Sequence, residues 1–156
     1  MHSGETVVVR LETTADKFVY CYYMDGLGQV SRIFPNRFQS DAFVPAGEPV
    51  EIPPGPERPF NIRLDTPGRI EFVACLSSPI EVQSSRIAGA DADDLTSIPG
   101  LRLNDLLHDF AALASTGARG QTMPISVIES AEGSPPQTPP QTRPQTYENP
   151  LTQRSR

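Results

Sequence analysis

The chain has 156 residues, of which 17 are proline, with 37 per cent hydrophobic residues and a formal net charge of −6. This length allows one domain of ordinary size, and a proline share of about 11 per cent is twice the usual ~5 per cent. Six of the prolines fall in residues 133–156, which hold almost no large apolar side chains. We therefore expect a folded domain over residues 5–132 and a disordered tail over residues 133–156, because the tail cannot bury enough surface to offset its ordering entropy.

The negative charge is concentrated in the domain. Of the 19 acidic and 13 basic residues, the tail holds one and three, which leaves residues 1–132 with 18 against 10 and a net charge of −8. A domain this acidic has no general electrostatic attraction to phosphate backbones or anionic lipids. We expect a protein partner and no nucleic-acid partner.

The sequence carries no membrane signal. No apolar stretch approaches the ~20 residues that span a bilayer, and residues 1–5 lack the basic start and apolar core of a signal peptide. The expected compartment is the cytoplasm, or the periplasm or cell envelope if a leader has been removed.

Strand patterns follow one another closely at the start of the domain. Residues 6–11 are a run rich in β-branched side chains. Residues 17–25 (KFVYCYYMD) are apolar or aromatic at both odd and even positions, as in a strand buried on both faces. An Asp-Gly-Leu-Gly turn at residues 25–28 leads into residues 29–34 (QVSRIF), which alternate like a hairpin partner.

The next segment is rich in proline, with seven prolines between residues 35 and 59. Proline excludes central strands there and leaves short edge pieces at residues 42–44 and 49–52. Residues 60–64 alternate again, and residues 69–76 (RIEFVACL) predict a second buried strand. Short strands at this spacing, with Gly and Pro turns, predict a mainly β fold: an antiparallel β-sandwich-like domain.

The pattern changes near residue 101. Residues 101–114 place apolar side chains at spacings of three and four, which predicts one amphipathic α-helix packed on the sheet. Asn104 is its expected N-cap and Gly117 its expected end, with His108 on the polar side. Residues 121–129 return to a strand pattern, and the tail's three tandem repeats ending in Pro-Gln-Thr predict an extended polyproline spacer.

Several motifs in residues 18–76 occur in one order. An aromatic strand and an Asp-Gly turn precede Phe34-Pro35-Asn36, and Ile52-Pro53, a Pro-Gly turn and an apolar strand ending in Ala-x-x-Ser follow. In these motifs the chain resembles a bacterial family of domains of unknown function. The resemblance implies a β-sandwich module without known catalysis, found alone behind secretory leaders or appended to caspase-like peptidases and protein kinases. Such domains commonly place a glutamate two residues after the Pro-Gly turn, and here that glutamate is shifted by one, to Glu71.

Candidate binding residues gather around the Phe-Pro-Asn motif. Each residue has a possible folding role, since Phe34 can pack inward, Pro35 can end a strand and Asn36 can bond the backbone of the next turn. The alternative is a binding surface formed by Phe34, Asn36, Arg37 and Phe38, because exposed Arg and Phe side chains are frequent interface anchors.

Other candidate sites are weaker. Cys21 and Cys75 are either two buried thiols or, if they face one another in an oxidising compartment, a disulfide. Two cysteines and two histidines without ligand spacing exclude a structural zinc site. The run Asp91, Asp93 and Asp94 lacks the glycine and distal glutamate of a calcium loop, so a solvated acidic loop is favoured.

Three tyrosines in the second predicted strand raise the question of a glycan-stacking platform. Tyr20, Tyr22 and Tyr23 point to alternate faces, which favours core packing instead. No Ser-His-Asp order, phosphate-binding glycine loop or carboxylate pair is visible. We therefore expect no enzyme, cofactor or metal, and a protein-interaction or scaffold module of the bacterial envelope, accessory to a secretion or surface machine. The alternative is a ligand-binding sensor or a regulatory module attached to a peptidase or kinase.

Overall fold

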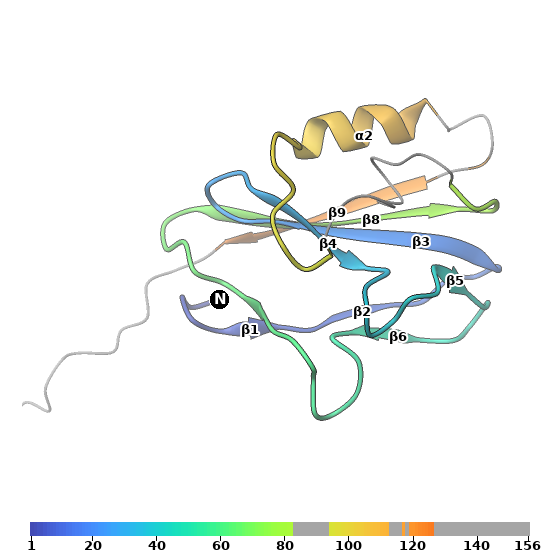
Figure 1. Cartoon of the computed structure of the whole chain (residues 1–156), viewed down its shortest axis with the longest axis horizontal. Coiled ribbons are helices and arrows are strands. Elements are labelled where there is room, and N and C mark those ends of the chain that lie inside the picture. The colour runs from blue at the N-terminus through green and yellow to red at the C-terminus, as the bar shows by residue number, and fades with distance from the viewer. Residues whose placement is uncertain (83–93, 113–116, 118, 127–156) are drawn as a thin grey trace, which may run out of the picture.

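The computed structural model describes residues 1–82, 94–112, 117 and 119–126 (Figure 1). These residues are mainly β, arranged in antiparallel sheets with one short helix, as the sequence predicts. The predicted tail, with its Pro-Gln-Thr repeats, and two acidic candidates, Asp91 and Asp93, lie outside the described residues.

A main antiparallel sheet forms the centre of the fold. Its strands are β3 (Lys17–Met24), β4 (Val30–Phe34), β5 (Phe43–Val44), β8 (Ile70–Ser78) and β9 (Arg119–Ser126). The order is β4-β3-β8-β9, and β5 pairs with the first residues of β3. The predicted hairpin of β3 and β4 is confirmed, and so is the second long buried strand, β8.

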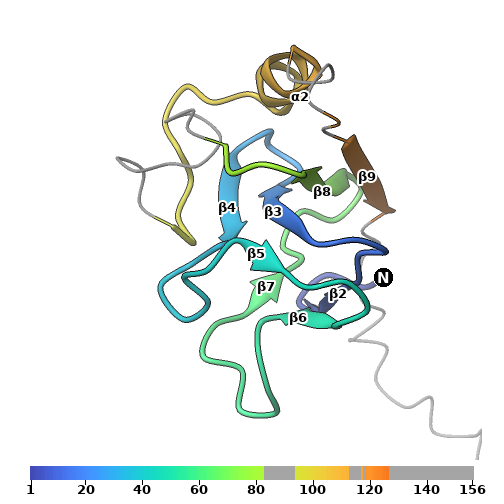
Figure 2. The same cartoon turned by 90° about the vertical axis from the view of Figure 1, so that its right-hand side faces the viewer.

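A second layer of short strands covers one face of this sheet. There β1 (Thr6–Val7) pairs with β7 (Ile62–Arg63), and β2 (Val9–Leu11) pairs with β6 (Val50–Ile52). The helix α2 (Leu103–Ala111) lies across the opposite face. Figure 2 shows the helix, the main sheet and the short strands as three successive layers.

Two hydrophobic cores lie on the two faces of the main sheet. The core toward the short strands consists of Val19, Cys21, Ile33, Phe34, Val44, Ile52, Ile62, Leu64 and Val73. The core toward the helix consists of Tyr20, Tyr22, Val30, Ala74, Leu76, Val82, Leu103, Leu106 and Phe110. Strand β3 contributes alternate residues to both, which confirms the prediction that it is buried on both faces. Tyr20 and Tyr22 therefore pack in the interior, whereas Tyr23 is partly buried and packs against the core toward the short strands.

Some predicted boundaries were wrong. The run 6–11 is two strands, because its halves pair with different partners, β7 and β6. The N-cap of α2 is Arg102, which makes no side-chain cap hydrogen bond, so the predicted cap Asn104 lies inside the first turn. The helix also ends at Ala111, before Gly117. Its position is set by the burial of apolar residues against the sheet, not by a capping side chain.

A proline in the edge strand β9 is explained by the register. Cys21 and Cys75 are directly opposed with a Cα–Cα distance of 4.1 Å, typical of a non-hydrogen-bonded pair. The backbone of Cys75 therefore bonds toward β9, and by alternation Phe72 and Pro124 form a non-hydrogen-bonded pair. The nitrogen of Pro124 faces away from β8, so the ladder loses no hydrogen bond and the outer edge is made less able to pair.

Candidate functional site

The Phe-Pro-Asn stretch forms the end of β4 and a tight turn. Phe34 is buried in the core toward the short strands, and Asn36 is 4 per cent exposed. The Asn36 side chain donates to the carbonyl of Ile33 at 2.7 Å, and its oxygen accepts from the backbone amides of Phe38 and Gln39, both at 2.9 Å. Two of the four predicted binding residues are thus engaged inside the fold.

Arg37 binds a residue far away in the sequence. Its guanidinium Nη2 lies 2.9 Å from Asp94 Oδ1, and its backbone amide lies 2.5 Å from Asp94 Oδ2. The hydrogen bond from Arg37 lowers the pKa of the Asp94 carboxyl below its ordinary value. Asp94 is therefore part of an ion pair and not of a solvated acidic loop.

This ion pair fixes residues 94–98, here called the strap, along the outer edge of β4. The backbone amide of Leu95 donates to the carbonyl oxygen of Arg32, and the amide of Ile98 donates to the carbonyl oxygen of Val30, each at 2.8 Å. The strap thereby satisfies backbone groups that an edge strand would otherwise expose.

Phe38, like Arg37, is an exposed member of the predicted set, at 49 per cent. Its ring stacks on Phe60 with a centroid distance of 6.0 Å and an interplanar angle of 20°. Phe60 in turn lines a pocket of about 250 Å³, here called the Tyr23 pocket. The residues that line it are Tyr23, Ser31, Ile33, Phe60, Asn61, Ile62, Arg63, Asp65 and Leu95. Phe38 and Arg37 thus lie beside this pocket through their contacts with Phe60 and the strap.

A buried carboxylate network lies behind the Tyr23 pocket. Glu71 is fully buried and accepts hydrogen bonds from the hydroxyls of Tyr23 and Thr66 and from the Thr66 amide at 3.2 Å. The amide of Gly26 donates to the same Thr66 hydroxyl at 3.0 Å. Burial and the Glu71 hydrogen bond raise the pKa of the Tyr23 phenol above its ordinary value, so the phenol stays protonated. The sequence signal was a glutamate near the start of an apolar strand.

Cys21 and Cys75 form a disulfide between the two central strands of the sheet. The bond spans 54 residues of sequence and its Cys21 end is fully buried. This decides the alternative that the sequence left open, since in-register pairing brings the two side chains together on one face.

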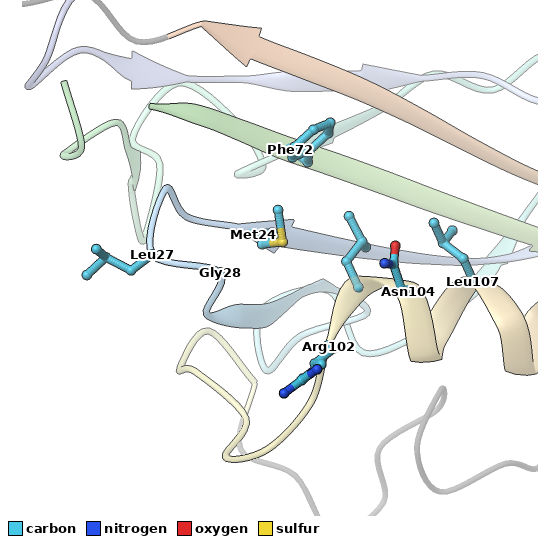
Figure 3. Close-up of a pocket in the computed structure, with 8 residues that line it drawn as sticks. Met24, Leu27, Gly28, Phe72, Arg102, Asn104 and Leu107 are labelled. Atoms are coloured by element: carbon cyan, nitrogen blue, oxygen red, sulfur yellow. The ribbon is translucent and has the colours of Figure 1, made fainter. Parts of the chain in front are cut away.

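An apolar cavity of about 470 Å³ lies between the start of α2 and the end of the β3–β4 hairpin (Figure 3). It is lined by Met24, Leu27, Gly28, Phe72, Arg102, Leu103, Asn104 and Leu107. A neighbouring cavity of about 440 Å³ shares Leu27, Gly28 and Arg102 and extends along residues 97–101. We call the two together the Leu27 groove. Sequence reasoning missed it, although an apolar residue at the tip of a Gly-flanked turn was a signal.

The described residues offer neither a metal cluster nor a membrane-spanning helix. Among the described residues, no group of three or more His, Cys, Asp or Glu side chains could hold a metal ion. Nor do these residues include a helix of the length and apolarity that a membrane span requires.

The profile of the domain of unknown function DUF4384 matches residues 1–79. The chain belongs to this family. The DUF4384 match contains β1 to β8, the disulfide and the Glu71 network, whereas α2 and β9 lie beyond it. The Leu27 groove is therefore shared, because the DUF4384 part supplies Met24, Leu27 and Phe72 and the following part supplies the helix side. No curated protein and no solved structure matches the chain.

Proposed function

We propose that this DUF4384 domain is a non-catalytic binding module of the bacterial envelope that holds a protein partner in the Leu27 groove. One observation carries the proposal: Leu27 is 70 per cent exposed at the mouth of a groove whose walls include Met24, Phe72 and Leu107. Exposure of an apolar side chain beside an apolar cavity to water is unfavourable. Burial of both against the apolar side chains of a partner is favourable.

The disulfide supports the envelope part of the proposal. Disulfides persist in oxidising compartments such as the periplasm and are rare in the cytosol. The Cys21–Cys75 bond joins the two central strands of the main sheet and lies in the core toward the short strands. It therefore stabilises the sheet whose opposite face carries the groove. A partner that belongs to a secretion or surface machine would make the module an accessory of that machine.

The hydrogen bonds of the buried Glu71 carboxylate support a binding role over a catalytic one. Glu71 accepts three hydrogen bonds within the chain, from Tyr23 and from both donors of Thr66. A carboxylate engaged in this way holds β3 to the turn before β8 and is not placed to exchange protons with a substrate.

Site-specific crosslinking in cells of the source organism tests the proposal. A photo-crosslinking amino acid is placed at position 27 of the full-length protein and, as a matched control, at position 57, where the exposed Glu57 lies in the loop between β6 and β7. We expect a discrete adduct from position 27, in the envelope fraction, that position 57 does not give. Identical adducts from both positions, or turnover of a peptide or glycan by the purified protein, would contradict it.

The Tyr23 pocket favours a second candidate, a ligand-binding sensor or a regulatory module attached to a peptidase or kinase. Its lining combines the Phe60 ring with the polar residues Asn61 and Arg63, a mixture that suits a small polar ligand. Ligand-observed NMR with a library of small polar compounds tests this candidate. Saturable binding that Phe60→Ala abolishes and the exposed control Phe43→Ala retains would favour the sensor, and unchanged binding in Phe60→Ala would exclude this pocket.

A further inference from the structure

The strap, residues 94–98, lines both candidate sites. Its residue Leu95 is part of the wall of the Tyr23 pocket, whereas Ser97 and Ile98 line the second cavity of the Leu27 groove. The two sites lie on opposite faces of the main sheet, because the pocket adjoins the core toward the short strands and the groove adjoins the core toward the helix. The strap therefore passes from one site to the other around the outer edge of β4 (Figure 2).

The backbone of the strap is strained at Leu95. This leucine has a φ of +62°, in the left-handed region that residues other than glycine, asparagine and aspartate rarely adopt. The Arg37–Asp94 ion pair holds the chain on one side of it, and the hydrogen bond from the Ile98 amide to β4 holds the chain on the other side. A strained residue held by neighbouring contacts has a relaxed alternative that becomes accessible when those contacts open.

We infer that the strap is a two-state element through which the Tyr23 pocket regulates the Leu27 groove. This inference rests on the proposed function and makes the ligand of the second candidate its effector. When the strap lies on β4 it completes a wall of each site, and when it leaves β4 both walls are lost. An occupant of the pocket that packs against Leu95 therefore favours the docked strap and strengthens the binding of a partner in the groove.

The strap is the movable connection between the two sites. Among the described residues, none lines both the pocket and the groove, so the two occupants do not touch a common side chain. The β3–β4 hairpin also runs from one site to the other, through Tyr23 and Met24, but the ladder of the main sheet holds its residues in register. Coupling over such a distance requires an element with two discrete arrangements, and the strap provides it.

Two substitutions at Leu95 test the inference, because this residue lines the pocket and not the groove. Leu95→Asn and Leu95→Thr introduce polar side chains of similar size, but asparagine tolerates a positive φ and the β-branched threonine disfavours it. Hydrogen exchange of the purified full-length protein reports on the strap at the Ile98 amide. We expect this amide to exchange about five- to tenfold faster in Leu95→Thr than in Leu95→Asn, while the amide of Ala74 in the central strand β8 exchanges alike in both.

The photo-crosslinking amino acid at position 27 reports on the groove in cells. We expect the yield of the position-specific adduct to be at least about fivefold higher in Leu95→Asn than in Leu95→Thr. Equal exchange of the Ile98 amide in the two variants would overturn the inference, and so would exchange of the Ala74 amide that rises with it in Leu95→Thr, because that result indicates global unfolding.

The adduct of the wild-type strap separates the two possible failures. Equal adduct yields from the wild-type strap and both variants at position 95 would reject the regulation and retain the binding module. The absence of any adduct specific to position 27 when the strap is wild type would reject the proposed function itself, and the regulation with it.

Discussion

The backbone amide of Gly26 donates a hydrogen bond to the hydroxyl of Thr66 at 3.0 Å, although 40 residues separate the two. The same hydroxyl donates to the buried Glu71, which also accepts from Tyr23. The Asp-Gly turn that carries Leu27 is therefore bonded directly to Thr66 in the turn before β8, and the Glu71 carboxylate holds that Thr66 hydroxyl in place. This network positions one wall of the Leu27 groove.

Gly26→Ala should destabilise the fold by about 2–3 kcal/mol, since overpacking of this kind costs ~1–3 kcal/mol. A Cβ at this position would stand 2.5 Å from the Cβ of Arg69 and would overlap Thr66. Urea denaturation followed by circular dichroism measures the effect. Gly28→Asn is the control, because Gly28 has a φ of +84° with open space around it and asparagine tolerates that conformation. Equal losses in the two variants would show that residue 26 has room for a side chain.

Removal of the disulfide in Cys21→Ala/Cys75→Ala should lower the free energy of unfolding by about 4 kcal/mol, the value that loop closure gives for the 54-residue separation. The physical reason is that the crosslink restricts the unfolded chain. The urea midpoint of the variant should match that of the wild-type protein unfolded in reductant. Thiol titration of wild-type protein expressed in an oxidising compartment should find no free thiol, and two reactive thiols after unfolding without reductant would contradict the bond.

Glu71→Gln should cost about 2–3 kcal/mol, because an amide replaces one acceptor oxygen with a donor that faces buried donors. Tyr23→Phe removes one of the same hydrogen bonds. A double-mutant cycle should show that the two losses are less than additive, by about 1 kcal/mol, because the side chains share one interaction. The exposed Glu51→Gln serves as the control and should change stability by less than ~0.5 kcal/mol. Strict additivity would mean that Tyr23 and Glu71 do not interact.

The Arg37–Asp94 ion pair predicts a pH dependence. The hydrogen bond from Arg37 lowers the pKa of Asp94 in the folded protein, so its contribution is fully present above the unfolded value of ~3.9 and is lost as the pH falls through the lower folded value. Wild type should exceed Asp94→Asn in stability at pH 7 by at most about 1 kcal/mol, since Arg37 is exposed. This difference should shrink below pH ~4.

Hydrogen exchange gives a local readout of the same ion pair. The amides of Leu95 and Ile98 bond to β4 and hold the strap. Their protection should fall in Asp94→Asn at pH 7, while that of Cys21 in the central strand should not change. A stability difference that grows on acidification would contradict a stabilising role of the Arg37–Asp94 ion pair. Equal exchange of the strap amides in both proteins would also contradict it.

Local patterns predicted most of the elements of this fold. The apolar residues of β3 and β8 at both parities indicated strands with two covered faces, and the spacing of Leu103, Leu106 and Phe110 indicated the helix that covers one of them. The turn role of Asn36 also followed from sequence, because an asparagine after a strand-ending proline bonds backbone groups a few residues away. All of these properties depend on neighbours within about one turn or strand.

The candidate site could not be predicted in the same way, because its residues meet only through long-range pairing. The sequence by itself determined which segments are strands, which faces are apolar and that the domain is acidic. The tertiary structure decided that Cys21 opposes Cys75, that Arg37 binds Asp94, and that Leu27, Phe72 and Arg102 line one groove. The periodicity of apolar residues shows which side of a segment faces a core. Strand register and the packing of the helix on the sheet decide which distant side chains come into contact there.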